Sequence, residues 1–116
     1  MYEHLNEVHL RGIVGAVNIS DVMGKTHASF ALAVSVRPVE DSNTLDSSIL
    51  LTTWFSVVAL NSERIDAQTL RSLSKGCTVE VHGRFRMVCY VDGKGDEKRT
   101  YEVIAHRLEI LSAEPE

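Results

Sequence analysis

The chain has 116 residues, a formal net charge of −4 and 44% hydrophobic residues. Its length is that of one domain, and its composition is that of a folded protein rather than a disordered one. No apolar run is long enough to span a bilayer, and the N-terminus lacks the basic and then apolar pattern of a secretory signal. We therefore expect a cytoplasmic protein that has no membrane partner.

The charges are unevenly distributed along the chain. Residues 71–99 contain seven basic and four acidic residues, whereas the rest of the chain is acidic. Because salt screens distant charges, a local basic stretch attracts a polyanion even on an acidic protein. The net charge alone therefore does not exclude nucleic acid as a partner.

The first part of the chain predicts two strands. Side chains alternate with a period of two over residues 8–14 and again over 29–36, as they do in strands. Gly15 indicates a bend or bulge after the first strand, and residues 18–27 predict a turn or loop. Pro38 ends the second strand, because proline cannot donate a hydrogen bond to a strand ladder.

The middle of the chain predicts a long connection, a third strand and a helix. Residues 37–49 are polar, and loops of this length are usually functional, so we expect this one to embrace a ligand. Residues 50–60 are rich in β-branched and aromatic side chains and predict the third strand. The helix is expected to have Asn61 or Ser62 as its N-cap and to end at Gly76 in the left-handed conformation.

The last part predicts a long hairpin. Side chains alternate over residues 79–90, and turn-forming residues fill 92–96. The final strand covers 101–110, where the alternation slips near His106, as a β-bulge requires.

The predicted elements give the order strand, strand, strand, helix, strand, strand. This is the order of an all-β, five-stranded Greek-key OB-fold barrel with one helix between strands 3 and 4. A β-sandwich would have more and shorter strands and no central helix. We therefore predict a single OB-fold domain over residues 1–111, followed by a short, frayed C-terminal end over 112–116.

Five segments of the chain form a series that points to a family. They are residues 6–12 (NEVHLRG), 28–33 (ASFALA), 53–58 (TWFSVV), 73–84 (LSKGCTVEVHGR) and 101–103 (YEV). In this order and spacing, they resemble the strands of the bacterial single-stranded DNA-binding proteins. No single segment is specific, but the series is, and it extends over about residues 6–111. The resemblance implies single-stranded DNA as the ligand, and a homotetramer, or at least a dimer, with the opening strand at the interface.

The chain also departs from the family pattern. Residues 16–20 stand where the family usually has a charged turn, and Leu60 stands where it commonly has an aromatic residue. Phe55 occupies a position that is often histidine at the oligomer interface, and a family tryptophan is absent near Arg37. The chain ends at Glu116 without the acidic-tipped tail that docks replication proteins. The resemblance implies such partners, whereas the missing tail counts against them and favours a specialised member.

A protein that binds single strands without sequence preference needs aromatic platforms for bases and a basic track for phosphates. Trp54 is the platform that the resemblance implies, and a buried core position is the alternative. Arg84, Arg86 and Tyr90 share one face of the fourth strand by parity. The predicted nucleic-acid-binding residues are Trp54, Tyr90, Arg84, Arg86, Arg11, Lys75, Lys94, Lys98 and Arg99.

The basic residues in this set also have plainer explanations. Those on the strands would solvate the outer face of the barrel, and those near the hairpin turn would keep the turn soluble. Lys75 is a favourable charge at the C-terminal end of the predicted helix.

The sequence shows no pattern that predicts catalysis, a metal or a cofactor. No two of the five histidines are three or four residues apart, and no P-loop or GxSxG motif is present. Cys77 and Cys89 are twelve residues apart and are expected to be small apolar side chains of the core or an interface, in a reducing compartment. We therefore expect a binding protein that is not an enzyme.

The predicted function is non-catalytic, largely sequence-independent binding of single-stranded DNA in replication, recombination and repair. The alternative is an accessory OB-fold protein, like the primosomal relatives of the family, that acts mainly through protein contacts. The net charge of −4 and the missing aromatic residues favour this alternative. A preference for RNA stays open, because stacking does not distinguish the two nucleic acids.

Overall fold

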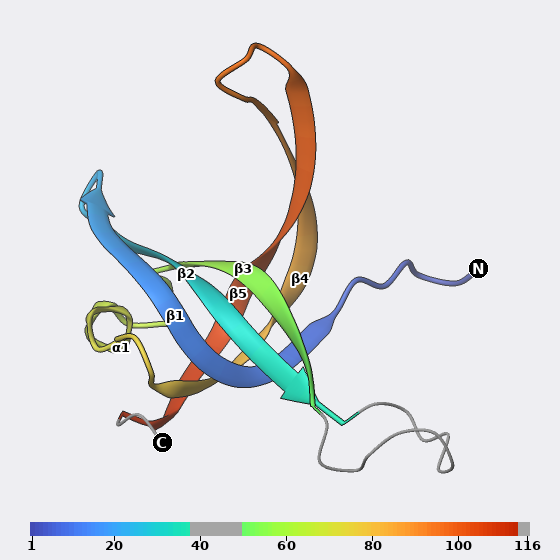
Figure 1. Cartoon of the computed structure of the whole chain (residues 1–116). Helices are drawn as coiled ribbons and strands as arrows, with labels where there is room; N and C mark the ends of the chain where they lie inside the picture. Colours follow the sequence, from blue (N-terminus) through green and yellow to red (C-terminus); the bar gives the residue numbers. More distant parts are fainter. Residues whose placement is uncertain (38–49, 114–116) are drawn as a thin grey trace, which may run out of the picture.

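The computed structural model describes residues 1–37 and 50–113, and in Figure 1 its strands curve around one another into a barrel. Hydrogen bonding connects the strands in the closed order β1-β2-β3-β5-β4. All neighbouring strands are antiparallel except β3 and β5, which are parallel. The elements are β1 (Val8–Val22), β2 (Lys25–Val36), β3 (Leu51–Leu60), α1 (Ala67–Arg71), β4 (Thr78–Val91) and β5 (Glu97–Ser112). This architecture confirms the predicted five-stranded OB-fold with one helix between the third and fourth strands.

The core of the barrel is built from the inward-facing half of each strand. Leu32, Val57, Val79 and Val81 are completely inaccessible to solvent. Burying each such side chain contributes roughly 1.5–3 kcal/mol to stability. Leu70 of α1 is also completely buried, so the helix packs against the barrel through this residue.

The expected loop over residues 18–27 is instead mostly strand. β1 continues to Val22 and pairs with β2, which begins at Lys25. Met23 and Gly24 form the two-residue connection with positive φ values of 52° and 80°. Consecutive positive φ values match the twist of a tight hairpin, which therefore extends further than the polar sequence suggested.

The predicted bulges are confirmed. Val14 pairs with Leu32 and Val17 with Phe30, so the register of β1 shifts around Gly15. His82 pairs with Arg107 and Gly83 with Ala105, which leaves His106 as the extra residue of β5.

The helix is shorter than predicted. α1 begins after Asp66, whose side chain accepts a hydrogen bond of 2.7 Å from the backbone N–H of Thr69. Ser62 accepts instead from the backbone of Ile65, in a separate turn before the helix. Gly76 has the expected left-handed conformation, with a φ of 96°. None of the helical structure in residues 1–37 and 50–113 has the length and apolarity that crossing a membrane requires.

Replacing Asp66 with alanine is expected to destabilise the chain at neutral pH. Hydrogen bonds from Thr69 lower the pKa of Asp66 below its ordinary value of 3.8. The stabilisation from a carboxylate with a lowered pKa is present above the unfolded value and disappears as the pH falls through the folded value. The urea midpoint of Asp66→Ala should therefore lie below that of the wild type at neutral pH, and the gap should narrow below pH 3.8.

The control for this prediction is Asp66→Asn, because asparagine caps helices about as well as aspartate. Its midpoint at neutral pH should lie closer to the wild type than that of Asp66→Ala. A gap for Asp66→Ala that stays constant with pH would contradict the role assigned to the carboxylate.

β4 and β5 extend beyond the barrel as a long hairpin, which projects at the top of Figure 1. Their pairing continues as far as Val91 and Glu97. The side chain of Asp92 closes the turn by accepting hydrogen bonds of 2.9 Å and 3.0 Å from the backbone N–H groups of Lys94 and Asp96. We call residues 84–104 the arm. Residues 37–49, the loop that is expected to embrace a ligand, lie almost entirely outside the described residues.

Candidate nucleic-acid interface

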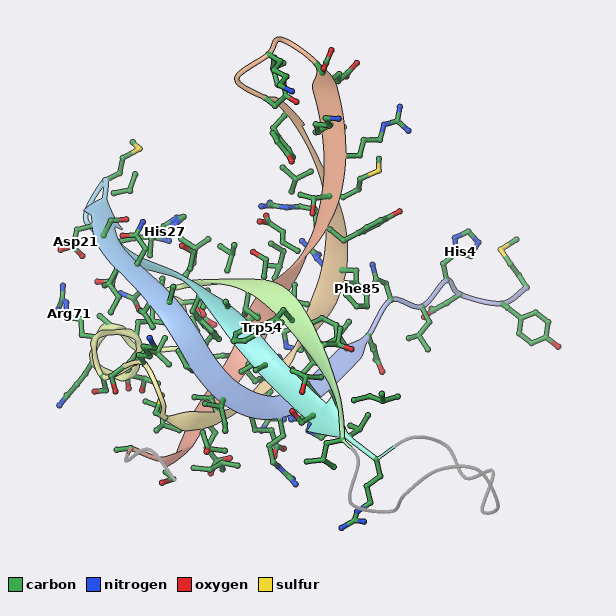
Figure 2. All side chains as sticks on the ribbon, in the orientation of Figure 1. His4, Asp21, His27, Trp54, Arg71 and Phe85 are labelled. Carbon is green, nitrogen blue, oxygen red and sulfur yellow. The ribbon has the colours of Figure 1, made fainter. Side chains whose placement is uncertain are left out.

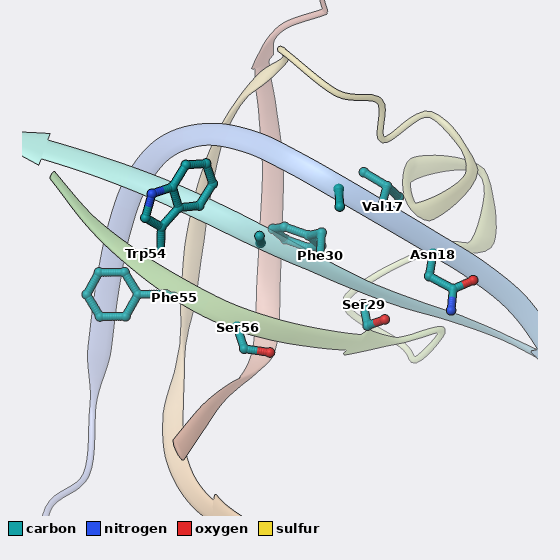
Figure 3. A pocket seen from close by; sticks show the side chains of 9 residues that line it. Val17, Asn18, Ser29, Phe30, Trp54, Phe55 and Ser56 are labelled. Atoms are coloured by element: carbon teal, nitrogen blue, oxygen red, sulfur yellow. The ribbon is translucent and has the colours of Figure 1, made fainter. Parts of the chain in front are cut away.

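Trp54 lies on the outer face of β3 with 62% of its surface exposed. In Figure 3 its ring lies beside β2 and β1 rather than inside the barrel. A Cβ atom added to Gly15 would lie only 2.9 Å from the Trp54 ring. The same added atom would lie 3.5 Å from Cβ of Ala31. The lack of a side chain at Gly15 therefore leaves room for the ring over β1, and the rest of the ring stays open to solvent. The alternative of a buried core tryptophan is wrong.

A shallow hollow of about 460 Å³ adjoins the ring on the β1-β2-β3 surface. Trp54 and Ser56 border it on β3, and Asn18 and Ser29 give it polar groups (Figure 3). An aromatic ring at the edge of an open hollow is a suitable support for a nucleobase.

The outer surface of β3 continues onto the arm. Val58 of β3 is aligned with Ile104 of β5, and Ile104 is aligned with Arg84 of β4. Aligned residues of neighbouring strands point to the same side of a sheet. The surface that carries Trp54 therefore extends without a change of side to Arg84.

Most of the predicted arm residues share this side. Arg86 and Tyr90 follow Arg84 at even spacings along β4, so their side chains point to the same side. Arg86 is aligned with Glu102 of β5, and Tyr90 is aligned with Lys98. We call this surface the arm's outer face; it comprises Arg84, Arg86, Val88, Tyr90, Lys98, Thr100 and Glu102. It brings together two guanidinium groups, an ammonium group and an exposed aromatic ring, which together suit phosphates and bases.

The two arginines of the arm's outer face differ in their surroundings. The Arg86 guanidinium forms an ion pair with Glu102, and its Nε lies 3.1 Å from the carboxylate. Arg84 has no ion pair with any residue in 1–37 or 50–113. A phosphate would have to compete with Glu102 for Arg86, whereas Arg84 is available directly.

The remaining predicted residues lie elsewhere. Arg99 is aligned with Cys89 and points to the opposite side of the arm, and Lys94 lies in its turn. Lys75 is exposed between α1 and β4. Arg11 lies on β1 and binds Glu80 of β4, with its Nε 2.9 Å from the carboxylate. The structure therefore brings five of the predicted residues onto one surface, namely Trp54, Arg84, Arg86, Tyr90 and Lys98. The other four, Arg11, Lys75, Lys94 and Arg99, lie off this surface.

The opposite side of the arm carries apolar side chains. Phe85 is 40% exposed, and its ring centroid lies 6.5 Å from that of the half-buried Phe55. Phe55 packs against the barrel core. Of the two cysteines, Cys77 is buried as expected, whereas Cys89 is exposed and does not belong to the core.

Sequence reasoning missed a cluster of His9, Glu80 and His82. The histidine Nε2 atoms lie 2.8 Å and 3.6 Å from the same oxygen, Oε1 of Glu80. Hydrogen bonds from His9 and then Arg11 lower the pKa of Glu80 to about 2. The spacing of these residues along the chain gives no sign of the cluster, because the pairing of β1 with β4 brings His9 opposite His82 and Arg11 opposite Glu80. The predicted OB-fold strand order contained the signal that would have found this cluster.

Comparisons with known proteins agree with the fold. The structure titled Plasmodium falciparum SSB complex with ssDNA is similar with a TM-score of 0.77 and 24% sequence identity, over 97% of this chain and 99% of that one. At this identity the likeness shows a shared fold. No curated protein matches the chain. A sequence model of the single-strand binding protein family matches residues 5–111. The chain therefore belongs to the single-strand binding protein family.

Proposed function

We propose that this protein binds single-stranded DNA without catalysing a reaction on it, and largely without regard to sequence. The observation that carries the proposal is the position of Trp54, which is 62% exposed on a surface that continues to the arginines of the arm. Membership of the single-strand binding protein family supports it. The similar Plasmodium falciparum structure, whose title describes a complex with single-stranded DNA, supports it as well.

In the proposed mechanism, one base stacks on the Trp54 ring beside the hollow on β1-β2-β3. The following nucleotides cross β3 and β5 toward the arm's outer face. Arg84 and Lys98 then contact phosphates, and a second base stacks on Tyr90. Arg86 gives up one of its hydrogen bonds to Glu102 and donates to a phosphate instead. Stacking tolerates any base because every base has a π face, so this arrangement accounts for weak sequence preference.

The proposal also covers the biological setting. We place the protein in the cytoplasm, in DNA replication, recombination and repair, as a homotetramer or a dimer. Several copies raise a modest affinity per subunit through effective concentration, because one strand can contact more than one subunit. Replication proteins are further proposed partners.

A second function, an accessory protein that acts through protein contacts, is favoured by one specific observation. Arg11 and Arg86 both form ion pairs with carboxylates of the same chain, with Glu80 and Glu102 respectively. Intramolecular pairing reduces the charge that is free to attract phosphates. The accessory function and DNA binding predict different results in a titration with oligonucleotide.

The test is a titration of the intrinsic fluorescence with oligo-dT at low and then moderate salt. Trp54 is the only tryptophan of the chain, so the signal reports one position. We expect strong quenching that salt reverses, with a log–log slope of about −0.7 for each phosphate neutralised. Duplex DNA of equal length is the control and should quench weakly. A folded, oligomeric protein that shows no quenching would contradict the proposal and favour the accessory function.

A further inference from the structure

A cluster of metal-ligating side chains lies where β4 closes the barrel against β1, on the outward-facing row of β4 that continues to Arg84. His9 is directly opposite His82 in the strand pairing, and Glu80 lies two residues before His82 on the same face of β4. The imidazole rings of His9 and His82 are stacked with their centroids 3.9 Å apart. Adjacent, hydrogen-bonded strands therefore hold all three side chains in place.

The ligand atoms converge on one point. One donor atom from each of His9, Glu80 and His82 lies within 4.8 Å of the other two. Within this group, Oε1 of Glu80 is 2.8 Å from Nε2 of His9 and 3.6 Å from Nε2 of His82. Two ligands of one tetrahedral zinc ion are roughly 3.3 Å apart, given bond lengths of about 2.0–2.2 Å. The observed separations bracket this value, so small rotations of the side chains would admit an ion.

From this geometry we infer that His9, Glu80 and His82 form a binding site for a divalent transition metal of the zinc type. Two imidazoles and one carboxylate are ligands that zinc accepts, and three protein ligands leave one position open for water.

The surroundings of the cluster fit this inference. Arg11 donates to Oε2 of Glu80 at 2.9 Å, which leaves Oε1 directed toward the histidines. Hydrogen bonds of this kind orient ligating carboxylates in metal sites. The side chain of His9 is 56% exposed, so an ion can enter from solvent.

Metal binding would connect β1 to β4 at the closure of the barrel, away from Trp54 on β3. Zinc binding is measured without DNA, so a failure of the metal site and a failure of the proposed DNA binding are distinguishable. An ion bound only by the folded chain also stabilises it by mass action, so metal should raise the thermal midpoint.

The test is calorimetric titration of the untagged chain with zinc chloride, together with thermal denaturation with and without the metal. We expect one zinc ion per chain and a higher thermal midpoint with zinc. Both effects should be lost in His9→Gln and in His82→Gln, because each variant removes one imidazole ligand. The matched control is His27→Gln on β2, which should behave as the wild type.

Two results would overturn the inference. One is a wild type that binds zinc no better than the double variant His9→Gln/His82→Gln. The other is binding that persists in both single variants. Circular dichroism without metal establishes that each variant is folded, and the two independent single variants keep the test decisive if one of them is not.

Discussion

Replacing Trp54 with alanine is expected to weaken binding of oligo-dT more than any other single substitution on the proposed surface. Loss of one stacking platform costs about 1–3 kcal/mol per base, a range established for single-strand binders of this class, and this corresponds to roughly 5- to 150-fold in affinity. The ring is 62% exposed and makes no contribution to the buried core, so the variant should fold. Because the substitution removes the intrinsic fluorophore, the measurement is polarisation of a labelled oligonucleotide.

The matched control for this experiment is Tyr101→Ala. Tyr101 is 64% exposed, as accessible as Trp54, but it is aligned with Met87 on the opposite side of the arm. If the strand follows the surface from Trp54 to the arm's outer face, Tyr101→Ala should bind as the wild type does. Equal losses in the two variants would contradict the path proposed for the DNA. A Trp54→Ala protein with full affinity would contradict the platform itself.

The fold could be predicted from the sequence because alternation of side chains is a local property of each strand. The inward positions of β4, such as Val79 and Val81, are apolar and buried, and the intervening Glu80 and His82 face outward. The same parity placed Arg84, Arg86 and Tyr90 on one side. Where polar residues faced solvent on both strands of a hairpin, as they do around Met23, the pattern was mistaken for a loop.

Contacts between strands could not be predicted in the same way. The Arg86–Glu102 pair joins residues 16 apart, and the Arg11–Glu80 pair joins residues 69 apart. Each depends on the register between two strands, which the alternation of side chains within one strand does not specify. The alternation of side chains therefore identified Arg11 and Arg86 as exposed basic residues. It did not identify Glu80 and Glu102, the carboxylates that form ion pairs with them. It also missed the pairing that brings His9 and His82 together.

Replacing Gly83 with alanine is expected to cause the largest loss of stability of any single methyl addition in the barrel. A Cβ atom at this position would lie 2.1 Å from the carbonyl oxygen of Ile104 and 3.1 Å from Cα of Ala105, and both atoms belong to the β5 backbone. The backbone can move only by breaking the pairing of β4 with β5 beside the His106 bulge. Overpacking of a well-filled interior costs typically 1–3 kcal/mol, and we expect at least about that much here because no flexible side chain can give way.

The matched control is Gly93→Ala, which adds the same methyl group in the hairpin turn, where a Cβ atom would meet nothing within 4 Å. Urea denaturation at one fixed chain concentration, followed by Trp54 fluorescence, measures both variants, and the fixed concentration removes the effect of oligomer dissociation. Gly93→Ala should keep the wild-type midpoint, whereas Gly83→Ala should shift to much lower urea or fail to fold. If the two midpoints agree, β4 and β5 must approach each other less closely at Gly83 than the barrel described here requires. The continuous outer surface from Trp54 to Arg84 would then lose its basis, because it depends on the same alignment of Ile104 with β4.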